Sequence, residues 1–207
     1  MILLLGASGY VGSAFAANLQ ARGLPFTSPS HAELDAGSKD ALASALDALH
    51  PDFVINAIGF TGRPNIDGTE NEKLRCLTAN TTVPGVLAEI LVDRGIPWGH
   101  VSSGCIFDGA SADGSPFTEI DPPNFAFSHP EASWYSRTKA MAETLLADHT
   151  NCTIWRLRIP FDQFDSERNY LSKLMRYDQL LEVTNSISQL QEFADACVET
   201  LLRRLPG

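Results

Sequence analysis

The sequence predicts an α/β protein built on a doubly wound parallel sheet. The first observation is an apolar run at residues 1–5 that leads through a glycine-rich turn into a helical pattern at residues 13–19. The second is that strand and helix patterns then alternate along the chain, as in successive strand–helix–strand units. The third is a composition of 44% hydrophobic and 19% charged residues, which supports one compact core. We therefore expect a single domain over residues 1–207.

Each further element has a local signal. Ser38 is placed to cap a helix that ends before Pro51, and Pro84 is expected to bend a long helix. The remaining expected strands lie at residues 25–28, 52–59, up to 103 and 153–159. The remaining expected helices lie at residues 38–49, 70–94 and 135–149, with a loop at residues 109–130. Because ligands bind outside the carboxyl ends of such strands, we expect the site at that edge of the sheet.

Three glycines spaced by three, Gly6, Gly9 and Gly12, follow the first strand and open the first helix. Glycine lets the backbone approach a pyrophosphate, whose charge is favoured at a helix N-terminus. This pattern indicates a dinucleotide-binding loop, with a glycine-rich β-turn as the alternative. The residues expected to hold the dinucleotide belong to this loop and to the small-residue end of the third strand: Gly6, Ser8, Gly9, Tyr10, Val11, Gly12, Ala57, Ile58 and Gly59.

Tyr135 and Lys139 lie four positions apart on one face of a predicted helix, which a merely solvated helix face would also allow. A nearby ammonium favours a phenolate, so we expect the pKa of Tyr135 to fall below its usual value of about 10. Ser103 follows the fourth strand at the same edge. We expect Ser103 to bind a carbonyl oxygen, Tyr135 to protonate it and Lys139 to hold the nicotinamide ribose. The predicted reaction is reduction of a ketone by a nicotinamide cofactor, or its reverse.

Charge and composition exclude several classes of protein. The net charge of −10 opposes binding to nucleic acid or to an anionic membrane. The first apolar run is too short for a signal peptide and has no basic residues before it, so we expect a cytoplasmic protein. The cysteines lie far apart and show no metal-ligand spacing, so we expect reduced thiols and no metal site: Cys76, Cys105, Cys152 and Cys197.

Several stretches, in order along the chain, resemble one family. The glycine loop, Ser103 and the Tyr135–Lys139 pair resemble the extended short-chain dehydrogenase/reductase superfamily, whose fold is the Rossmann fold. Over residues 1 to about 195 the chain resembles the nucleotide-rhamnose synthase/epimerase-reductase family. The stretches that carry this resemblance are Asn56-Ala57-Ile58-Gly59-Phe60-Thr61-Gly62-Arg63-Pro64-Asn65, Ser103-Gly104-Cys105-Ile106-Phe107, Pro123-Asn124-Phe125, Tyr135-Ser136-Arg137-Thr138-Lys139-Ala140-Met141, Arg156-Leu157-Arg158-Ile159-Pro160, Arg168-Asn169-Tyr170-Leu171-Ser172-Lys173 and Thr184-Asn185-Ser186-Ile187.

The resemblance implies an activity. A nucleotide-linked 4-keto-6-deoxyglucose would be epimerised at C3 and C5 and reduced at C4 by NADPH, giving a nucleotide-L-rhamnose. Ser103 stands where family members carry Thr and keeps the hydroxyl group, while Tyr135 and Lys139 match without change. Cys105 and Lys173 occupy the positions of the proposed epimerisation acid and base. Their alternative interpretations are a small buried residue and a solvated helix position.

The resemblance also implies a nucleotide-sugar substrate. Arg offers a bidentate fork to phosphate and Asn suits sugar hydroxyls, although turn formation is the alternative role for several of these residues. Asn80 is expected either to order the catalytic region or to cap a bend. The complete expected substrate-binding set is Arg63, Asn65, Asn80, Asn124, Arg158 and Asn185.

The sequence departs from the family at two places. Residues 27–31 contain no acidic residue to bind the ribose 2′-hydroxyl of NAD, which favours NADPH. The Arg that family members carry there is also absent, so NADH stays open as a cofactor. The chain ends at Leu205-Pro206-Gly207, where family members continue for several dozen residues. We therefore expect a truncated or reduced C-terminal substrate lobe, with its elements in about residues 160–207.

Three functions stay open at this point. The first is the bifunctional epimerase/reductase, acting on a UDP- or dTDP-linked sugar. The second is a 4-keto reductase alone, like dTDP-4-dehydrorhamnose reductase. The third is a non-catalytic nucleotide-binding regulatory subunit, which the intact Tyr135–Lys139 pair argues against. By analogy with the superfamily, the protein is expected to form a homodimer.

Overall fold

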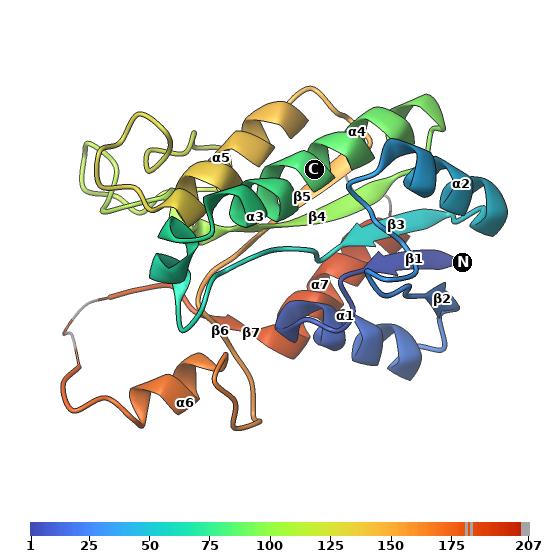
Figure 1. Cartoon of the computed structure of the whole chain (residues 1–207). Helices are drawn as coiled ribbons and strands as arrows, with labels where there is room; N and C mark the ends of the chain where they lie inside the picture. Colours follow the sequence, from blue (N-terminus) through green and yellow to red (C-terminus); the bar gives the residue numbers. More distant parts are fainter. Residues whose placement is uncertain (181, 183, 204–207) are drawn as a thin grey trace.

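A computed structural model of the chain describes residues 1–180, 182 and 184–203, so the expected chain end at 205–207 lies outside the described residues. Five parallel strands form a sheet in the order β2-β1-β3-β4-β5 (Figure 1). Their bounds are Ile2–Leu5 for β1, Phe26–Thr27 for β2, Phe53–Asn56 for β3, Trp98–Ser103 for β4 and Cys152–Leu157 for β5. The chain crosses from one side of β1 to the other between β2 and β3. This confirms the predicted doubly wound parallel sheet.

Helices cover both faces of the sheet (Figure 1). One face is covered by α2 (Lys39–Leu49), α4 (Val83–Asp93) and α5 (Trp134–Leu146). The other is covered by α1 (Tyr10–Ala21) and α7 (Leu190–Leu202). A second, two-stranded parallel sheet pairs β6 (Pro160–Phe161) with β7 (Ser188–Gln189), and α6 (Tyr170–Leu174) lies between these strands in the chain, apart from the main sheet. The elements β6, α6 and β7 therefore lie outside the main sheet.

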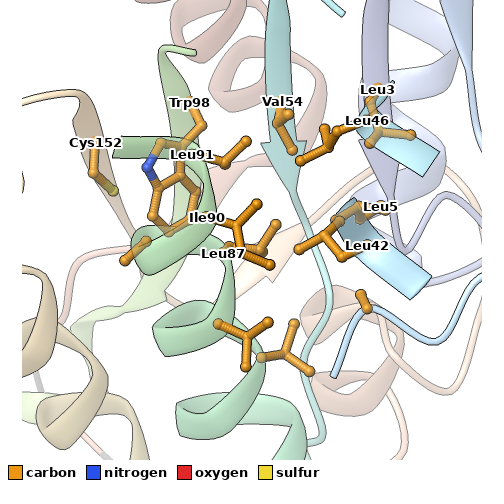
Figure 2. Close-up of a cluster of buried hydrophobic side chains, with 14 of the residues drawn as sticks. Leu3, Leu5, Leu42, Leu46, Val54, Leu87, Ile90, Leu91, Trp98 and Cys152 are labelled. Carbon is orange, nitrogen blue, oxygen red and sulfur yellow. The ribbon is translucent and has the colours of Figure 1, made fainter. Parts of the chain in front are cut away.

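Alternation along the strands builds two cores. Leu3 and Leu5 of β1 point toward α2 and α4, while Ile2 and Leu4 point toward α1 and α7. Figure 2 shows the first core, which the buried Trp98 ring fills at its edge. The second core contains a stacked pair of Phe15 and Trp155, whose ring centroids lie 5.6 Å apart. Burial on both faces explains why β1 and β3 are almost wholly apolar.

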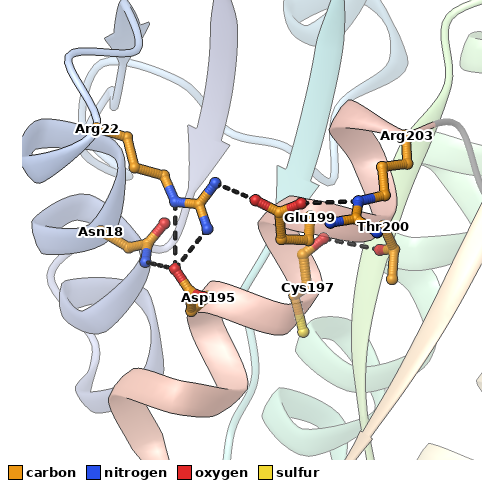
Figure 3. A network of polar contacts seen from close by, with 7 residues as sticks. All are labelled: Asn18, Arg22, Asp195, Cys197, Glu199, Thr200 and Arg203. Atoms are coloured by element: carbon orange, nitrogen blue, oxygen red, sulfur yellow. Dashed lines mark hydrogen bonds and ion pairs between the residues drawn. The ribbon is translucent and has the colours of Figure 1, made fainter.

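A polar network fastens α7 to α1 at the surface (Figure 3). Arg22 donates to Asp195 and to Glu199, and Asn18 Nδ2 also donates to Asp195 at 2.9 Å. Exposed ion pairs contribute little stability, so the apolar contacts between these helices hold them together and the network fixes their register. Directly before α7, β7 lies beside the residues that follow β5, where the Ser188 amide donates to the carbonyl oxygen of Ile159 at 3.3 Å.

The expected long helix at residues 70–94 is helical without a break from Lys73 to Asp93, but it contains a π-helical turn. The structure forms a 3₁₀ turn at Ile66–Glu70, the short helix α3 (Lys73–Leu77), a π-helical turn at Thr78–Thr82 and then α4. The distortion therefore precedes Pro84 rather than centring on it. Thr81 Oγ1 donates to the carbonyl oxygen of Thr138 at 2.8 Å, which holds the widened turn against α5. Helix α5 ends at Leu146 and not at residue 149.

Candidate active site

The glycine loop connects β1 to α1 and has no room for side chains at two positions. Gly6 has φ of +82°, and a Cβ there would lie 2.8 Å from the carbonyl carbon of Ala57. A Cβ on Gly12 would lie 2.0 Å from the carbonyl oxygen of Gly6. Gly9 is the N-cap of α1 and offers no side chain to the first-turn amide groups. The loop therefore fits a diphosphate, which would bind to those amides.

Helix α5 is fixed against the end of β4 by a buried lysine. The N-cap Ser133 accepts a hydrogen bond from the Ser136 amide at 3.1 Å, which begins the helix just before Tyr135. Tyr135 and Lys139 then follow on successive turns, and both are buried. Lys139 Nζ donates to the carbonyl oxygen of Val101 at 2.9 Å. Because Val101 lies two residues before Ser103 on β4, this bond holds α5 where the Tyr135 side chain lies beside Ser103.

The protonation of the pair differs from the sequence-based expectation. Burial raises the pKa of Tyr135 above its usual 10.0, the charge of Cys105 adds to the effect, and the Ser103 side chain opposes it only in part. The prediction of a lowered Tyr135 pKa is therefore wrong, because desolvation of the phenolate dominates. Burial also lowers the pKa of Lys139 from 10.5 to about 8. Tyr135 is thus a neutral phenol near pH 7 and can donate a proton.

A cavity of about 620 Å³ opens at the carboxyl edge of the sheet and joins the two parts of the site. Its volume lies in the range of roughly 300–1,000 Å³ that is usual for small-molecule sites. The expected catalytic residues that line it are Ser103, Cys105, Tyr135, Lys139 and Lys173. The expected cofactor residues that line it are Ser8, Gly9, Tyr10, Val11, Ala57, Ile58 and Gly59. Of the expected substrate residues, Arg63 and Asn65 line it.

The other expected residues lie behind the cavity. Gly6 and Gly12 shape the glycine loop but do not line the cavity. Asn80 is fully buried, and its side chain bonds both the amide and the carbonyl of Phe60, at 2.8 and 3.0 Å. The Asn124 side chain likewise bonds both the amide and the carbonyl of Asp108. Both asparagines therefore order loops, and neither reaches a substrate in this cavity.

Arg158 and Asn185 also have roles that differ from the expected substrate contact. Arg158 Nη1 donates to the carbonyl oxygen of Gly104 at 3.1 Å and lies 3.5 Å from Cys105 Sγ. Arg158 Nε donates to Asn185 Oδ1 at 3.1 Å. Neither residue lines the cavity. These contacts connect Arg158 and Asn185 to the turn that carries Cys105.

Sequence reasoning missed Arg168 as a site residue. Arg168 Nη1 donates to Thr61 Oγ1 at 2.6 Å and Nη2 to the carbonyl oxygen of Gly62 at 3.2 Å. The guanidinium thereby ties the segment that carries Lys173 to the loop that carries Arg63. The available signal was its place in the same short stretch as Lys173. The lining residues that were not predicted are Thr61, Ile66, Val101, Ser102, Leu157, Ile159, Pro160, Arg168 and Tyr170.

These features define a class of protein. A glycine loop at the point where the strand order reverses, with Ser, Tyr and Lys at the neighbouring strand end, is the arrangement of the extended short-chain dehydrogenase/reductase superfamily. Within it, residues 1–188 match the family described as "RmlD substrate binding domain". The chain belongs to that family.

Relatives and solved structures agree with this placement. The chain is 31% identical over 99% of its length to a bifunctional dTDP-4-dehydrorhamnose 3,5-epimerase/dTDP-4-dehydrorhamnose reductase of Arabidopsis thaliana, of which it covers 67%. It covers 30% of longer trifunctional relatives from the same plant. The crystal structure of the L780 UDP-rhamnose synthase from Acanthamoeba polyphaga mimivirus superposes with a TM-score of 0.90 and 26% identity, covering 100% of this chain and 72% of that one. The NADP complex of a dTDP-4-dehydrorhamnose reductase from Bacillus anthracis shares the fold, with a TM-score of 0.74 and 15% identity over 97% of this chain and 70% of that one.

None of the described helices is both long enough and apolar enough to cross a bilayer.

The buried ammonium predicts a pH-dependent effect of Lys139→Met on stability. The folded-state pKa of Lys139 is about 8, below its ordinary value of 10.5, so between these pH values the unfolded chain binds a proton that the folded chain does not. The cost of the buried charge is therefore complete below pH 8 and disappears as the pH rises toward 10.5. We expect Lys139→Met to stabilise the fold at pH 7 by up to about 3 kcal/mol, with the gain shrinking above pH 8. Urea unfolding from pH 7 to 10 measures this, with Lys39→Met as the surface control, and a gain that does not vary with pH contradicts it.

Proposed function

We propose that this protein reduces the C4 ketone of a nucleotide-linked 4-keto-6-deoxyhexose with NADPH, and that the same cavity epimerises C3 and C5. The observation that carries the proposal is the meeting of the glycine loop with Ser103, Tyr135 and Lys139 in one cavity. Supporting it are the names of its relatives, which include a dTDP-4-dehydrorhamnose reductase activity and a UDP-rhamnose synthase. The expected product is a nucleotide-L-rhamnose.

The reduction needs one hydride and one proton. When bound, NADPH supplies the hydride that forms the new C–H bond at the carbonyl carbon. The Tyr135 phenol, kept neutral by burial, gives its proton to the carbonyl oxygen as the C=O double bond becomes a single bond. The Ser103 hydroxyl orients that oxygen, and the Lys139 ammonium binds the ribose and favours the phenolate that remains. A proton from solvent then restores the phenol.

The glycine loop and the neighbouring strand ends suit NADPH. The first-turn amides of α1 offer donors for the pyrophosphate, and Ala57, Ile58 and Gly59 line the adjacent wall. Residues 27–31, at the end of β2, carry no carboxylate that would repel a 2′-phosphate. The Bacillus anthracis relative is named as a complex with NADP. NADPH is therefore the proposed cofactor.

The opposite part of the cavity suits the substrate diphosphate. Arg63, Arg168 and Lys173 line it, although the whole chain carries a net charge of −10. Arg63 and Arg168 lie far apart in the sequence. The hydrogen bonds from Arg168 to Thr61 and Gly62 hold their two segments together. Such a cluster would attract the diphosphate of a UDP- or dTDP-sugar.

The epimerisation needs a base and an acid beside the ketone. A proton removed from C3 or C5 leaves an enolate that the C4 carbonyl stabilises, and return of a proton to the opposite face inverts the carbon. Cys105 and Lys173 both line the cavity, and each has a group able to give or take that proton. Arg158 Nη1 lies 3.5 Å from Cys105 Sγ and contacts the turn that carries the thiol. We propose this pair for the two roles.

Removal of the phenol hydroxyl tests the reduction. With NADPH and UDP- or dTDP-4-keto-6-deoxyglucose, we expect Tyr135→Phe to lower the turnover number by about 10²- to 10⁴-fold, because the proton donor is lost. The loss of NADPH absorbance measures turnover, and NADPH fluorescence checks that the variant still binds the cofactor. Turnover by Tyr135→Phe equal to that of the unaltered protein contradicts the proposed mechanism.

Removal of the thiol tests the epimerisation separately. In D₂O we expect the unaltered protein to introduce deuterium at C3 and C5 of the sugar, and Cys105→Ala to lose this exchange by at least about 10²-fold. The same variant should still reduce a substrate that has already been epimerised. NMR of the sugar measures both results, with Cys197→Ala, a buried cysteine outside the cavity, as the matched control. An unaltered protein that reduces but never exchanges deuterium would favour a reductase without epimerase activity.

A further inference from the structure

A buried carboxylate lies one turn beyond Lys139 on α5 and takes no part in the chemistry described above. Glu143 is only 6% exposed. Its Oε1 accepts a hydrogen bond from Ser102 Oγ at 2.5 Å, and its Oε2 accepts from Arg156 Nη2 at 2.8 Å, with Arg156 Nε also in range. A buried carboxylate needs such partners because unpaired burial of its charge is strongly unfavourable. Four donated contacts satisfy it here.

The partners of Glu143 come from the strands that end at the site. Ser102 of β4 and Arg156 of β5 are direct partners in the sheet register, so both side chains leave the sheet on the face that α5 covers. Arg156 Nη1 also donates to the carbonyl oxygen of Glu119 at 2.9 Å, and its guanidinium lies 5.1 Å from the Phe107 ring. The carboxylate therefore holds together α5, both strands and the loop that runs from Cys105 to α5.

Three successive turns of α5 contact three neighbouring residues at the end of β4. Lys139 bonds Val101, and Glu143 bonds Ser102, the residue immediately before Ser103. Tyr135, one turn earlier on the helix, lies beside Ser103 itself. Movement of α5 along the strand would therefore break the Glu143 contacts at the same time as it separated Tyr135 from Ser103.

We propose that Glu143 is a positioning residue of this active site, which holds α5 in register with β4 and places a fixed negative charge one turn from Lys139. Its role in ketone reduction rests on the proposed function, whereas its contacts with Ser102 and Arg156 do not. The position fits the need for rigid support behind reacting groups, which tolerate only small displacements.

The charge of Glu143 acts on Lys139 because the other titratable groups around the lysine are neutral. Burial lowers the pKa of His100 on β4, and it raises the pKa of Cys76 on α3 and of Tyr135 on α5. Against the burial that lowers the pKa of Lys139, the neighbouring Cys76 and Glu143 both act in the opposite direction. Glu143 thus favours the protonated form of the lysine.

The first experiment follows the Lys139 amine directly and needs neither substrate nor cofactor. The chain has four lysines, Lys39, Lys73, Lys139 and Lys173, so ¹³C-labelled lysine side chains can be titrated by NMR and the signal of Lys139 assigned with Lys139→Met. We expect Glu143→Gln, which keeps the shape and removes the charge, to lower the Lys139 midpoint by about half a pH unit or more. Glu143→Asp should restore most of this midpoint. Glu89→Gln, which removes an exposed carboxylate of α4 paired with Lys39, should leave it unchanged.

The second experiment measures turnover with NADPH and the keto sugar. We expect Glu143→Gln and Glu143→Asp both to lower the turnover number on the order of tenfold, because both disturb the register. A Lys139 midpoint in Glu143→Gln equal to that in Glu89→Gln overturns the proposal, as does unchanged turnover in both Glu143 variants. If the unaltered protein turns over no nucleotide sugar, the proposed function fails while the titration still decides the positioning role.

A variant of the partner arginine covers the case in which Glu143→Gln does not fold. Arg156→Gln leaves the Glu143 charge with fewer partners, so the field at Lys139 becomes more negative. We expect the Lys139 midpoint to rise, opposite to the change in Glu143→Gln. A midpoint that falls or stays unchanged in Arg156→Gln overturns the proposal.

Discussion

The buried ammonium of Lys139 is the constraint on which the rest of the site depends. Desolvation opposes its charge, and the fold offsets this with the Val101 carbonyl oxygen at 2.9 Å and with the nearby carboxylate of Glu143. To reach that carbonyl, α5 must lie directly on β4, and this places Tyr135 beside Ser103. Gly59, three residues after β3, lies beside the same ammonium, because a Cβ there would be in van der Waals contact with Lys139 Nζ at 3.5 Å. One interaction therefore links the catalytic pair to the wall of the cofactor cavity.

The electrostatics of the cavity differ from those of the chain as a whole. The net charge is −10, yet Arg63, Lys139, Arg168 and Lys173 all line the cavity. This local excess of positive charge suits a doubly phosphorylated ligand, whereas the acidic surface elsewhere repels larger polyanions. Within the cavity, burial keeps Tyr135 protonated and brings the pKa of Lys139 to about 8. A neutral acid beside a cation is the combination that reduction of a ketone requires at neutral pH.

The sheet and the lining residues near it could be predicted because their signals are local. Alternating apolar runs define the strands, and the parallel order then brings Ser8, Gly59, Ser103 and Tyr135 to one edge. The behaviour of side chains over longer distances could not be predicted. Asn80 and Asn124 were expected to bind substrate. Instead, the side chain of each bonds the backbone of a loop that only the folded chain brings near. The Tyr135 pKa was predicted in the wrong direction because spacing reveals a nearby lysine but not the extent of burial. Arg168 was missed because its contacts with Thr61 and Gly62 span more than 100 residues.

These observations converge on one claim: the edge formed by β1, β3, β4 and α5 holds a reduced nicotinamide against the C4 carbonyl of a nucleotide sugar. The most direct measurement uses NADPH that carries deuterium at the transferable C4 position, together with UDP- or dTDP-4-keto-6-deoxyglucose. The account predicts that NMR will find deuterium bonded to C4 of a rhamnosyl product, in an amount equal to the NADPH oxidised. Oxidation of NADPH without deuterium at C4 of the sugar, or no oxidation with either nucleotide sugar, would contradict it.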